Sequence, residues 1–188
     1  MPDFTITDEI ISKIAKQYSV KKERIEVVRE FYKKFSGSMK QQYLAHVIRT
    51  MEDRLRVVTG NEMFRIICSP VAASSPELGL AKSQYYPGRF FAIYYHPSTN
   101  EKQLRVLIAH ELGHLFLVEL ANSIPDTREC NEGTETEPLS SILGIFIIMD
   151  KNEFYHNKTV PYKHTSPDEV LKDFSLMEKR SKNIFNVS

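Results

Sequence analysis

A short histidine–glutamate motif constrains this chain more than any other feature of its sequence. His110-Glu111-Leu112-Gly113-His114 follows the H-E-x-x-H pattern and lies in an apolar segment with helical periodicity. Residues four apart on an α-helix are separated by only about 40° around the axis, so both imidazoles project from one face. Two such imidazoles can share a metal ion, and zinc accepts nitrogen ligands in a tetrahedral shell. The spacing therefore predicts a metal site on a helix.

Two further residues of the motif fit this interpretation. Glu111 directly follows the first candidate ligand, so its carboxylate is expected beside the metal, where a general base for an activated water belongs. Gly113 costs roughly 1 kcal/mol relative to Ala inside a helix, which makes sense if another backbone segment packs closely there. The alternative is a core helix whose two histidines are hydrogen-bonded and bind no metal.

Composition places the chain among ordinary globular proteins. Its 188 residues are enough for one domain with a sizeable core, and 41% of them are hydrophobic. The formal net charge of +1 provides no global basic field, so we expect no direct nucleic acid binding. Cys68 and Cys130 form no CxxC pair and fit a reducing compartment. No apolar leader or run of about 20 apolar residues is present, so we expect a cytoplasmic protein without membrane association.

Apolar periodicity predicts several helices before and after the motif. Residues 7–36 are typical of a helical pair, residues 40–58 carry a third apolar stripe, and Ser166-Pro167 begins a last helix that ends near Arg180. The first pair has some features of a helix-turn-helix. Its second helix carries three acidic residues, Glu23, Glu26 and Glu30, which the phosphates of DNA would repel. We therefore favour a packing or partner-binding role for the pair.

Two strands are predicted between the third helix and the motif helix, at residues 63–68 and 89–96. The Ser-, Pro- and Gly-rich stretch 69–88 is expected to be a long irregular loop beside the substrate cleft. The edge of the second strand is expected to accept an extended peptide.

The patterns predict an α+β fold, with a small sheet packed on the motif helix. Residues 1–60 would form an N-terminal helical segment, and residues 61–188 the core with its C-terminal helix.

A catalytic zinc site needs a third protein ligand and a position open to water. No third histidine follows on the motif helix, and the next candidates are acidic: Asp126, Glu129, Glu132, Glu135 and Glu137. Glu137 directly precedes Pro138, which favours the first helical turn, and an apolar helix follows to Met149. A carboxylate there would be fixed on a buried helix that can pack against the motif helix. Cys68 is an alternative third ligand, as in a deformylase-like amidase.

Three stretches of the chain resemble the ImmA/IrrE group of zincin-like metallopeptidases: Ile93-Tyr-Tyr-His-Pro97, Arg105-Val-Leu-Ile-Ala-His-Glu-Leu-Gly-His114 and Glu135-Thr-Glu-Pro-Leu-Ser-Ser-Ile-Leu-Gly-Ile-Phe-Ile-Ile-Met149. That family shows a strand ending in a Pro or Asn turn, an A-H-E-[LI]-G-H helix and a later E-x-E-A helix. The resemblance implies a zincin-like fold with Zn²⁺ as the cofactor. It also implies that His110, His114 and Glu137 are the metal ligands and Glu111 the catalytic residue.

The same resemblance implies a biological setting. Proteins of this family are bacterial or phage-derived, and several are associated with cleavage of helix-turn-helix repressors that control mobile elements or stress genes. For this chain it implies a zinc metallopeptidase that hydrolyses a peptide bond in a specific protein, such as a transcriptional repressor.

The second family motif is looser than the first. Pro138 stands where the family favours Ala, and Leu139 and Ser141 stand where Asn and Phe are usual. Glu135 is therefore the second choice for the third ligand.

Further alternatives concern the metal, the chemistry and the remaining site residues. A His₂Glu set also accommodates Mn, Fe or Co. Tyr155 and His156 are candidates for stabilising an oxyanion because they follow the site in the sequence. Besides a peptidase, two classes stay open: a non-proteolytic regulatory or binding module that keeps the metal site, and another zinc amidohydrolase.

Overall fold

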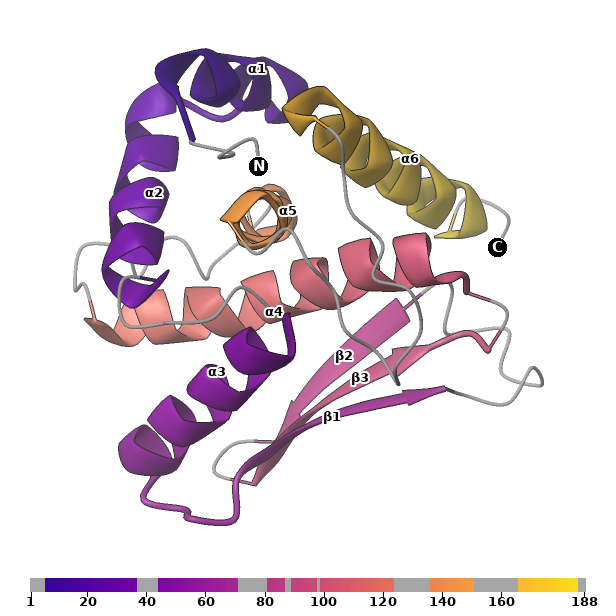
Figure 1. The fold of residues 1–188 in the computed structure, drawn as a ribbon. Helices are drawn as coiled ribbons and strands as arrows, with labels where there is room; N and C mark the ends of the chain where they lie inside the picture. The colour runs from indigo at the N-terminus through magenta and orange to yellow at the C-terminus, as the bar shows by residue number, and fades with distance from the viewer. Residues whose placement is uncertain are drawn as a thin grey trace.

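The computed structural model describes residues 6–36, 44–70, 81–86, 89–97, 99–123, 136–150 and 166–185. The helices are α1 (Asp8–Tyr18), α2 (Lys22–Ser36), α3 (Leu44–Thr59), α4 (Glu101–Ser123), α5 (Thr136–Asp150) and α6 (Pro167–Phe185). The strands are β1 (Arg65–Pro70), β2 (Ala81–Tyr86) and β3 (Phe90–Tyr95). These elements form the predicted α+β architecture. As Figure 1 shows, α4 separates the sheet from a group of helices formed by α1, α2, α5 and α6.

Helix α5 lies at the centre of the helical group. Its large apolar side chains, from Leu139 to Met149, are at most 2% exposed on every face of the helix. A helix that is apolar all round is stable only when neighbours cover it on all sides. Helices α2, α4 and α6 contact α5, and Figure 1 shows α5 end-on among them. The prediction of a buried helix that follows Glu137 and packs against the motif helix is confirmed.

Residues 7–36 form two helices, as the sequence predicted. Helix α2 packs on α5, and α1 packs on α2 and is tied to α6. Helix α1 begins at an N-cap, Thr7, whose side chain accepts a hydrogen bond from the amide of Ile10, and it ends at Ser19 in the left-handed conformation. Gln17 donates a hydrogen bond of 3.2 Å to the carbonyl of Leu171, which ties α1 to α6. The division of the chain at residue 60 stays a prediction.

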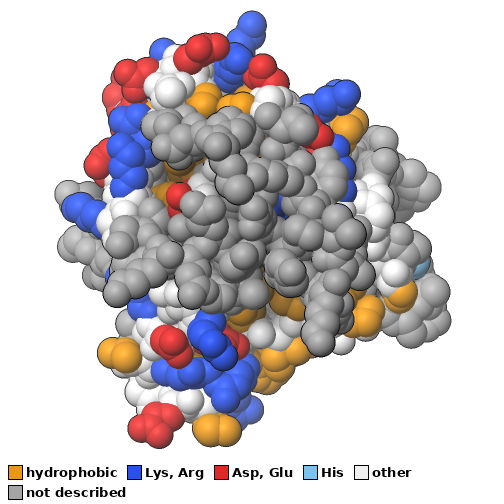
Figure 2. Space-filling model, in the orientation of Figure 1, with side chains coloured by type: hydrophobic (Ala, Val, Ile, Leu, Met, Phe, Trp, Pro, Cys, Tyr) orange, Lys and Arg blue, Asp and Glu red, His pale blue; other side chains and the backbone are white. Residues whose placement is uncertain are grey.

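Charged side chains of both signs cover the outer surface of α1 and α2. Figure 2 shows acidic and basic groups intermixed over these helices, which agrees with a net charge near zero. No helix in the described part of the chain is both long enough and apolar enough to cross a membrane.

A buried hydrogen bond joins α2 to the end of α5, and its removal would test how the two helices pack. The hydroxyl of Tyr32, whose ring is 1% exposed, donates a bond of 2.8 Å to Oδ2 of Asp150. We expect Tyr32→Phe to lower the free energy of unfolding by about 1–2 kcal/mol, because the carboxylate loses a buried partner. Urea denaturation measures this change. Lys33→Gln, which alters an exposed ion pair with Glu30 on the same helix, is the control and should cost below about 0.5 kcal/mol. Equal losses in the two variants would contradict the contact.

The sheet has the strand order β1-β3-β2, with β3 parallel to β1 and antiparallel to β2. Two predictions about this region are wrong. The stretch 69–88 is not wholly a loop, because it contains β2. The edge of β3 is not free for a peptide, because β3 is the central strand and both its edges are paired.

Strand β2 was missed because its sequence, Ala-Lys-Ser-Gln-Tyr-Tyr, has no β-branched residue. Main-chain pairing with β3 holds it, in a register that runs from Ala81 opposite Tyr95 to Tyr86 opposite Phe90. The rings of Tyr86 and Phe90 add a contact at a centroid distance of 4.2 Å. Helix α6 differs from its prediction only in length. It runs past Arg180 to Phe185, since this segment has no Gly or Pro to stop it.

Candidate metal centre

Two elements bring three potential ligands together. Helix α4 supplies His110 and His114, and the first turn of α5 supplies Glu137. Nε2 of His110 lies 3.3 Å from Oε2 of Glu137, and Nε2 of His114 lies 3.4 Å from Oε1. One ligand atom from each residue falls within 4.8 Å of the others, so the group could hold a metal ion. Two atoms bound tetrahedrally to zinc at about 2.0–2.1 Å are themselves about 3.3–3.4 Å apart. Both histidine–glutamate separations are therefore compatible with ligands that share one metal ion.

The close approach of α4 and α5 depends on glycine. A Cβ atom at Gly113 would overlap the carbonyl oxygen of Ser140 and lie 2.8 Å from its carbonyl carbon. At the next contact along α5, a Cβ at Gly144 would lie 3.0 Å from the backbone of Ala109. The prediction that a backbone segment packs against Gly113 is confirmed. This short separation lets Glu137 reach both histidines of α4.

Two serines of α5 hold the histidine rings from the side opposite the carboxylate. Oγ of Ser140 lies 2.8 Å from Nδ1 of His114, and Oγ of Ser141 lies 3.0 Å from Nδ1 of His110. Both serines follow Glu137 by three and four residues, so all three side chains share one face of the helix. When Nδ1 carries the proton and donates it to a serine oxygen, Nε2 keeps its lone pair for a metal. One stretch of α5 thus provides a candidate ligand and the support of both rings.

The charges around the group favour a cation. Burial, followed by the charge of His110, lowers the pKa of His114. Burial also opposes a charge on His110, but its hydrogen bond to Glu137 and the nearby acidic side chains raise the pKa of this ring overall. The same hydrogen bond lowers the pKa of Glu137, against the effect of burial. The carboxylates therefore create a negative field in which a divalent cation would be stabilised.

Glu111 lies next to the ligand group but does not belong to it. Its side chain is buried, with 6% exposure, and it directly follows His110 on α4. Its negative charge acts on both His110 and His114 in the direction that raises their pKa values. The carboxylate therefore acts electrostatically on both rings and is not one of the three candidate ligands, and its role as the base stays a prediction.

Other predicted site residues are not brought to this group. Cys68 lies on β1, apart from the histidines, and burial raises the pKa of its thiol to about 11. Because Cys68 is not among the three residues that converge at this site, the structure gives no support to a cysteine as the third ligand. Seven residues named from the sequence lie outside the described residues: Asp126, Glu129, Cys130, Glu132, Glu135, Tyr155 and His156.

Sequence reasoning missed Ser140 and Ser141 as parts of the site. The available signal was their spacing from Glu137, because a helical ligand places residues three and four positions later on its own face. That signal becomes specific only when the crossing of α4 and α5 is known.

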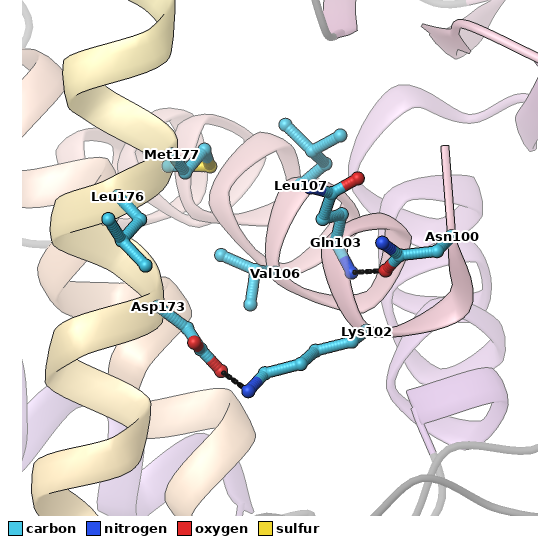
Figure 3. Close-up of a pocket in the computed structure, with 8 residues that line it drawn as sticks. All are labelled: Asn100, Lys102, Gln103, Val106, Leu107, Asp173, Leu176 and Met177. Atoms are coloured by element: carbon cyan, nitrogen blue, oxygen red, sulfur yellow. Dashed lines mark hydrogen bonds and ion pairs between the residues drawn. The ribbon is translucent and has the colours of Figure 1, made fainter. Parts of the chain in front are cut away.

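A pocket of about 200 Å³ lies between the first turns of α4 and the middle of α6. As Figure 3 shows, an ion pair between Lys102 and Asp173 crosses it, and Leu176 and Met177 of α6 face Val106 of α4. None of the three candidate ligands lines this pocket. It belongs to the surface along which α6 docks on α4.

Comparisons with known proteins identify no relative: no family model, curated protein or solved structure matches this chain. The resemblance to the ImmA/IrrE group stays a prediction, and function has to be inferred from the chemistry of the site.

Proposed function

We propose that this protein is a zinc-dependent metallopeptidase of the ImmA/IrrE type, which hydrolyses a peptide bond in a specific protein substrate. The observation that carries the proposal is the convergence of two imidazole nitrogens and a carboxylate in one group that could hold a metal ion. The adjacent buried carboxylate of Glu111 adds the base that hydrolysis requires. A catalytic zinc site has three protein ligands, which is the number in the group found among the described residues.

In this proposal each residue has a distinct role. When bound, zinc supplies a Lewis acid and lowers the pKa of a water ligand to about 7. His110, His114 and Glu137 hold the ion. Glu111 accepts a proton from the attacking water and returns it to the leaving amine. The side chain of Glu137 is 73% exposed while the histidines are mostly buried, so substrate would approach from the Glu137 side.

The sheet offers a place for an extended substrate segment. Within the described residues, β2 pairs only with β3, and it contacts α4. An unpaired strand edge next to the metal helix suits a peptide that adds by main-chain hydrogen bonds. We place the substrate at β2 rather than at β3, whose edges are taken. A repressor-like protein is the substrate that the family resemblance suggests.

Zinc dependence and peptide cleavage can be tested together. A peptide library is prepared by tryptic digestion of a whole-cell lysate and incubated with the zinc-loaded protein, and new N-termini are identified by mass spectrometry. We expect cleavage that stops on chelation with 1,10-phenanthroline and returns with zinc. Glu137→Gln should weaken zinc binding by more than about 100-fold, since even outer-shell changes cost 10–100-fold.

Glu62→Gln, an exposed glutamate outside the ligand group, is the matched control and should bind zinc normally. Zinc binding without any cleavage would contradict the peptidase and favour a regulatory module that keeps its metal. Equal affinities of the Glu137 and Glu62 variants would contradict the ligand set itself.

A further inference from the structure

A second carboxylate reaches the metal centre from the C-terminal helix. Ser141, which is 1% exposed, donates a hydrogen bond of 2.6 Å to Oε1 of Glu178 on α6. The same hydroxyl oxygen lies 3.0 Å from Nδ1 of His110. A chain of two hydrogen bonds therefore connects α6 to one of the candidate metal ligands.

The direction of this chain follows from the donors available. A hydroxyl has one proton, and an ionised carboxylate can only accept. If Ser141 donates to Glu178, its oxygen must accept the proton on Nδ1 of His110. That assignment fixes the tautomer of His110 and leaves Nε2 with a free lone pair on the side of Glu137. His114 has the corresponding contact with Ser140.

Helix α6 is held firmly enough to place this carboxylate. Lys102 of α4 bonds to Glu169 at 3.3 Å and to Asp173 at 3.0 Å, and Figure 3 shows the second of these ion pairs. One turn before Glu178, the ring of Phe174 is fully buried against Gly144 of α5. Glu178 follows Phe174 by four residues and therefore lies on the same side of α6, where it is partly buried.

The first helix approaches the same carboxylate. Burial and the nearby charge of Glu178 raise the pKa of Tyr18, at the end of α1, well above its usual range. Helix α1 is bound to α6 through Lys13, which lies 2.9 Å from Asp168. Glu178 is itself partly buried, and the hydroxyl of Ser141 is its hydrogen-bond partner. The hydrogen bond from Ser141 to Glu178 is therefore easier to explain as part of the metal centre than as a contact that only packs α6 on α5.

We infer that Glu178 is a positioning residue of the metal centre, which acts through Ser141 to fix the orientation and tautomer of His110. The inference rests on the proposed metal-binding function. Carboxylates that orient ligating histidines typically contribute 10–100-fold to metal affinity. The C-terminal helix is then part of the site rather than an appendage to it.

The test compares zinc affinities by competition with a chromophoric chelator. Glu178→Met keeps the length of the side chain and removes the acceptor, and we expect about 10–100-fold weaker binding. Ser141→Ala should lose a similar factor, and the double variant little more than either single one, because both act through one chain. Glu62→Met, the same change at an exposed glutamate that lies outside the ligand group and outside α6, is the control and should keep wild-type affinity.

Proton NMR of the zinc-loaded, ¹⁵N-labelled protein gives a readout that packing alone would not change. We expect slowly exchanging Nδ1 protons on both histidines in the wild type. Glu178→Met should accelerate exchange at His110 and leave His114, which Ser140 holds, unchanged. If Glu178→Met does not fold, Glu178→Gln keeps an acceptor oxygen and should lose less than about tenfold in affinity, with a shifted His110 signal.

Three outcomes separate the inference from the proposal on which it rests. Wild-type affinity and an unchanged His110 signal in either folded Glu178 variant would overturn the inference alone. Purely additive losses in the double variant would also overturn it, because Glu178 would then act by another route. A wild-type protein that binds no zinc would instead overturn the proposed function.

Discussion

Glu111→Gln is expected to reduce peptide cleavage by about 10²–10⁴-fold and to leave zinc affinity unchanged. The substitution preserves the size of a buried side chain that is 6% exposed, so the fold should tolerate it. It removes the group that accepts a proton from the attacking water. Because Glu111 is not one of the three candidate ligands, the metal should still bind. Cleavage of the tryptic peptide library and chelator competition measure the two quantities on the same preparations.

The matched control is Glu52→Gln, which changes a glutamate on α3 that accepts a hydrogen bond of 2.8 Å from the amide of Ile66. This variant should retain cleavage, since its contacts are with Ile66 of β1 and Arg56 of α3 rather than with the histidines. Near-normal cleavage by Glu111→Gln would contradict the assigned base. Loss of zinc together with cleavage would show that Glu111 acts as a ligand instead.

Gly113→Ala is expected to lower the free energy of unfolding by about 3 kcal/mol, because the added methyl group would push against the backbone of Ser140. The direction of this change in stability distinguishes Gly113 from an ordinary helix glycine. The same change inside a helix normally stabilises it by about 1 kcal/mol. Separation of α4 from α5 should also move Glu137 away from the histidines and weaken zinc binding. Urea denaturation of the metal-free protein and chelator competition test the two effects.

Gly144→Ala provides a graded comparison on the other helix. Its added methyl group would meet the edge of the Phe174 ring at 2.9 Å and the backbone of Ala109 at 3.0 Å. A side chain can move more easily than a backbone, so this variant should lose less stability than Gly113→Ala. A stabilised Gly113→Ala protein would mean that the two helices do not approach as closely as the structure shows.

Much of this architecture is predictable because the main elements have strong local signals. The N-cap at Thr7, the H-E-x-x-H helix and the apolar helix after Pro138 are encoded by capping, spacing and continuous hydrophobicity. Strand β2 has no such signal, because pairing with β3 rather than its own composition holds it in place.

The residues of the candidate site also fall into those with a local sequence signal and those without one. His110, Glu111 and His114 are separated by fixed helical spacings, and they can be identified without any tertiary information. Glu137 needed the position of Pro138 and a family resemblance. The spacing of Ser141 from Glu137 becomes informative only when the crossing of α5 and α4 is known. Glu178 has no local signal at all, because its role depends on the tertiary position of α6 beside α5.

The first turns of α5 carry Glu137, Ser140 and Ser141 on a single stretch of backbone. The carboxylate of Glu137 and the two serine hydroxyls that contact the histidine rings therefore cannot move independently of one another. Any rotation or sliding of α5 would displace all three together relative to α4. The geometry of the centre thus depends as a whole on how the two helices cross, and the glycine contacts set how closely they approach.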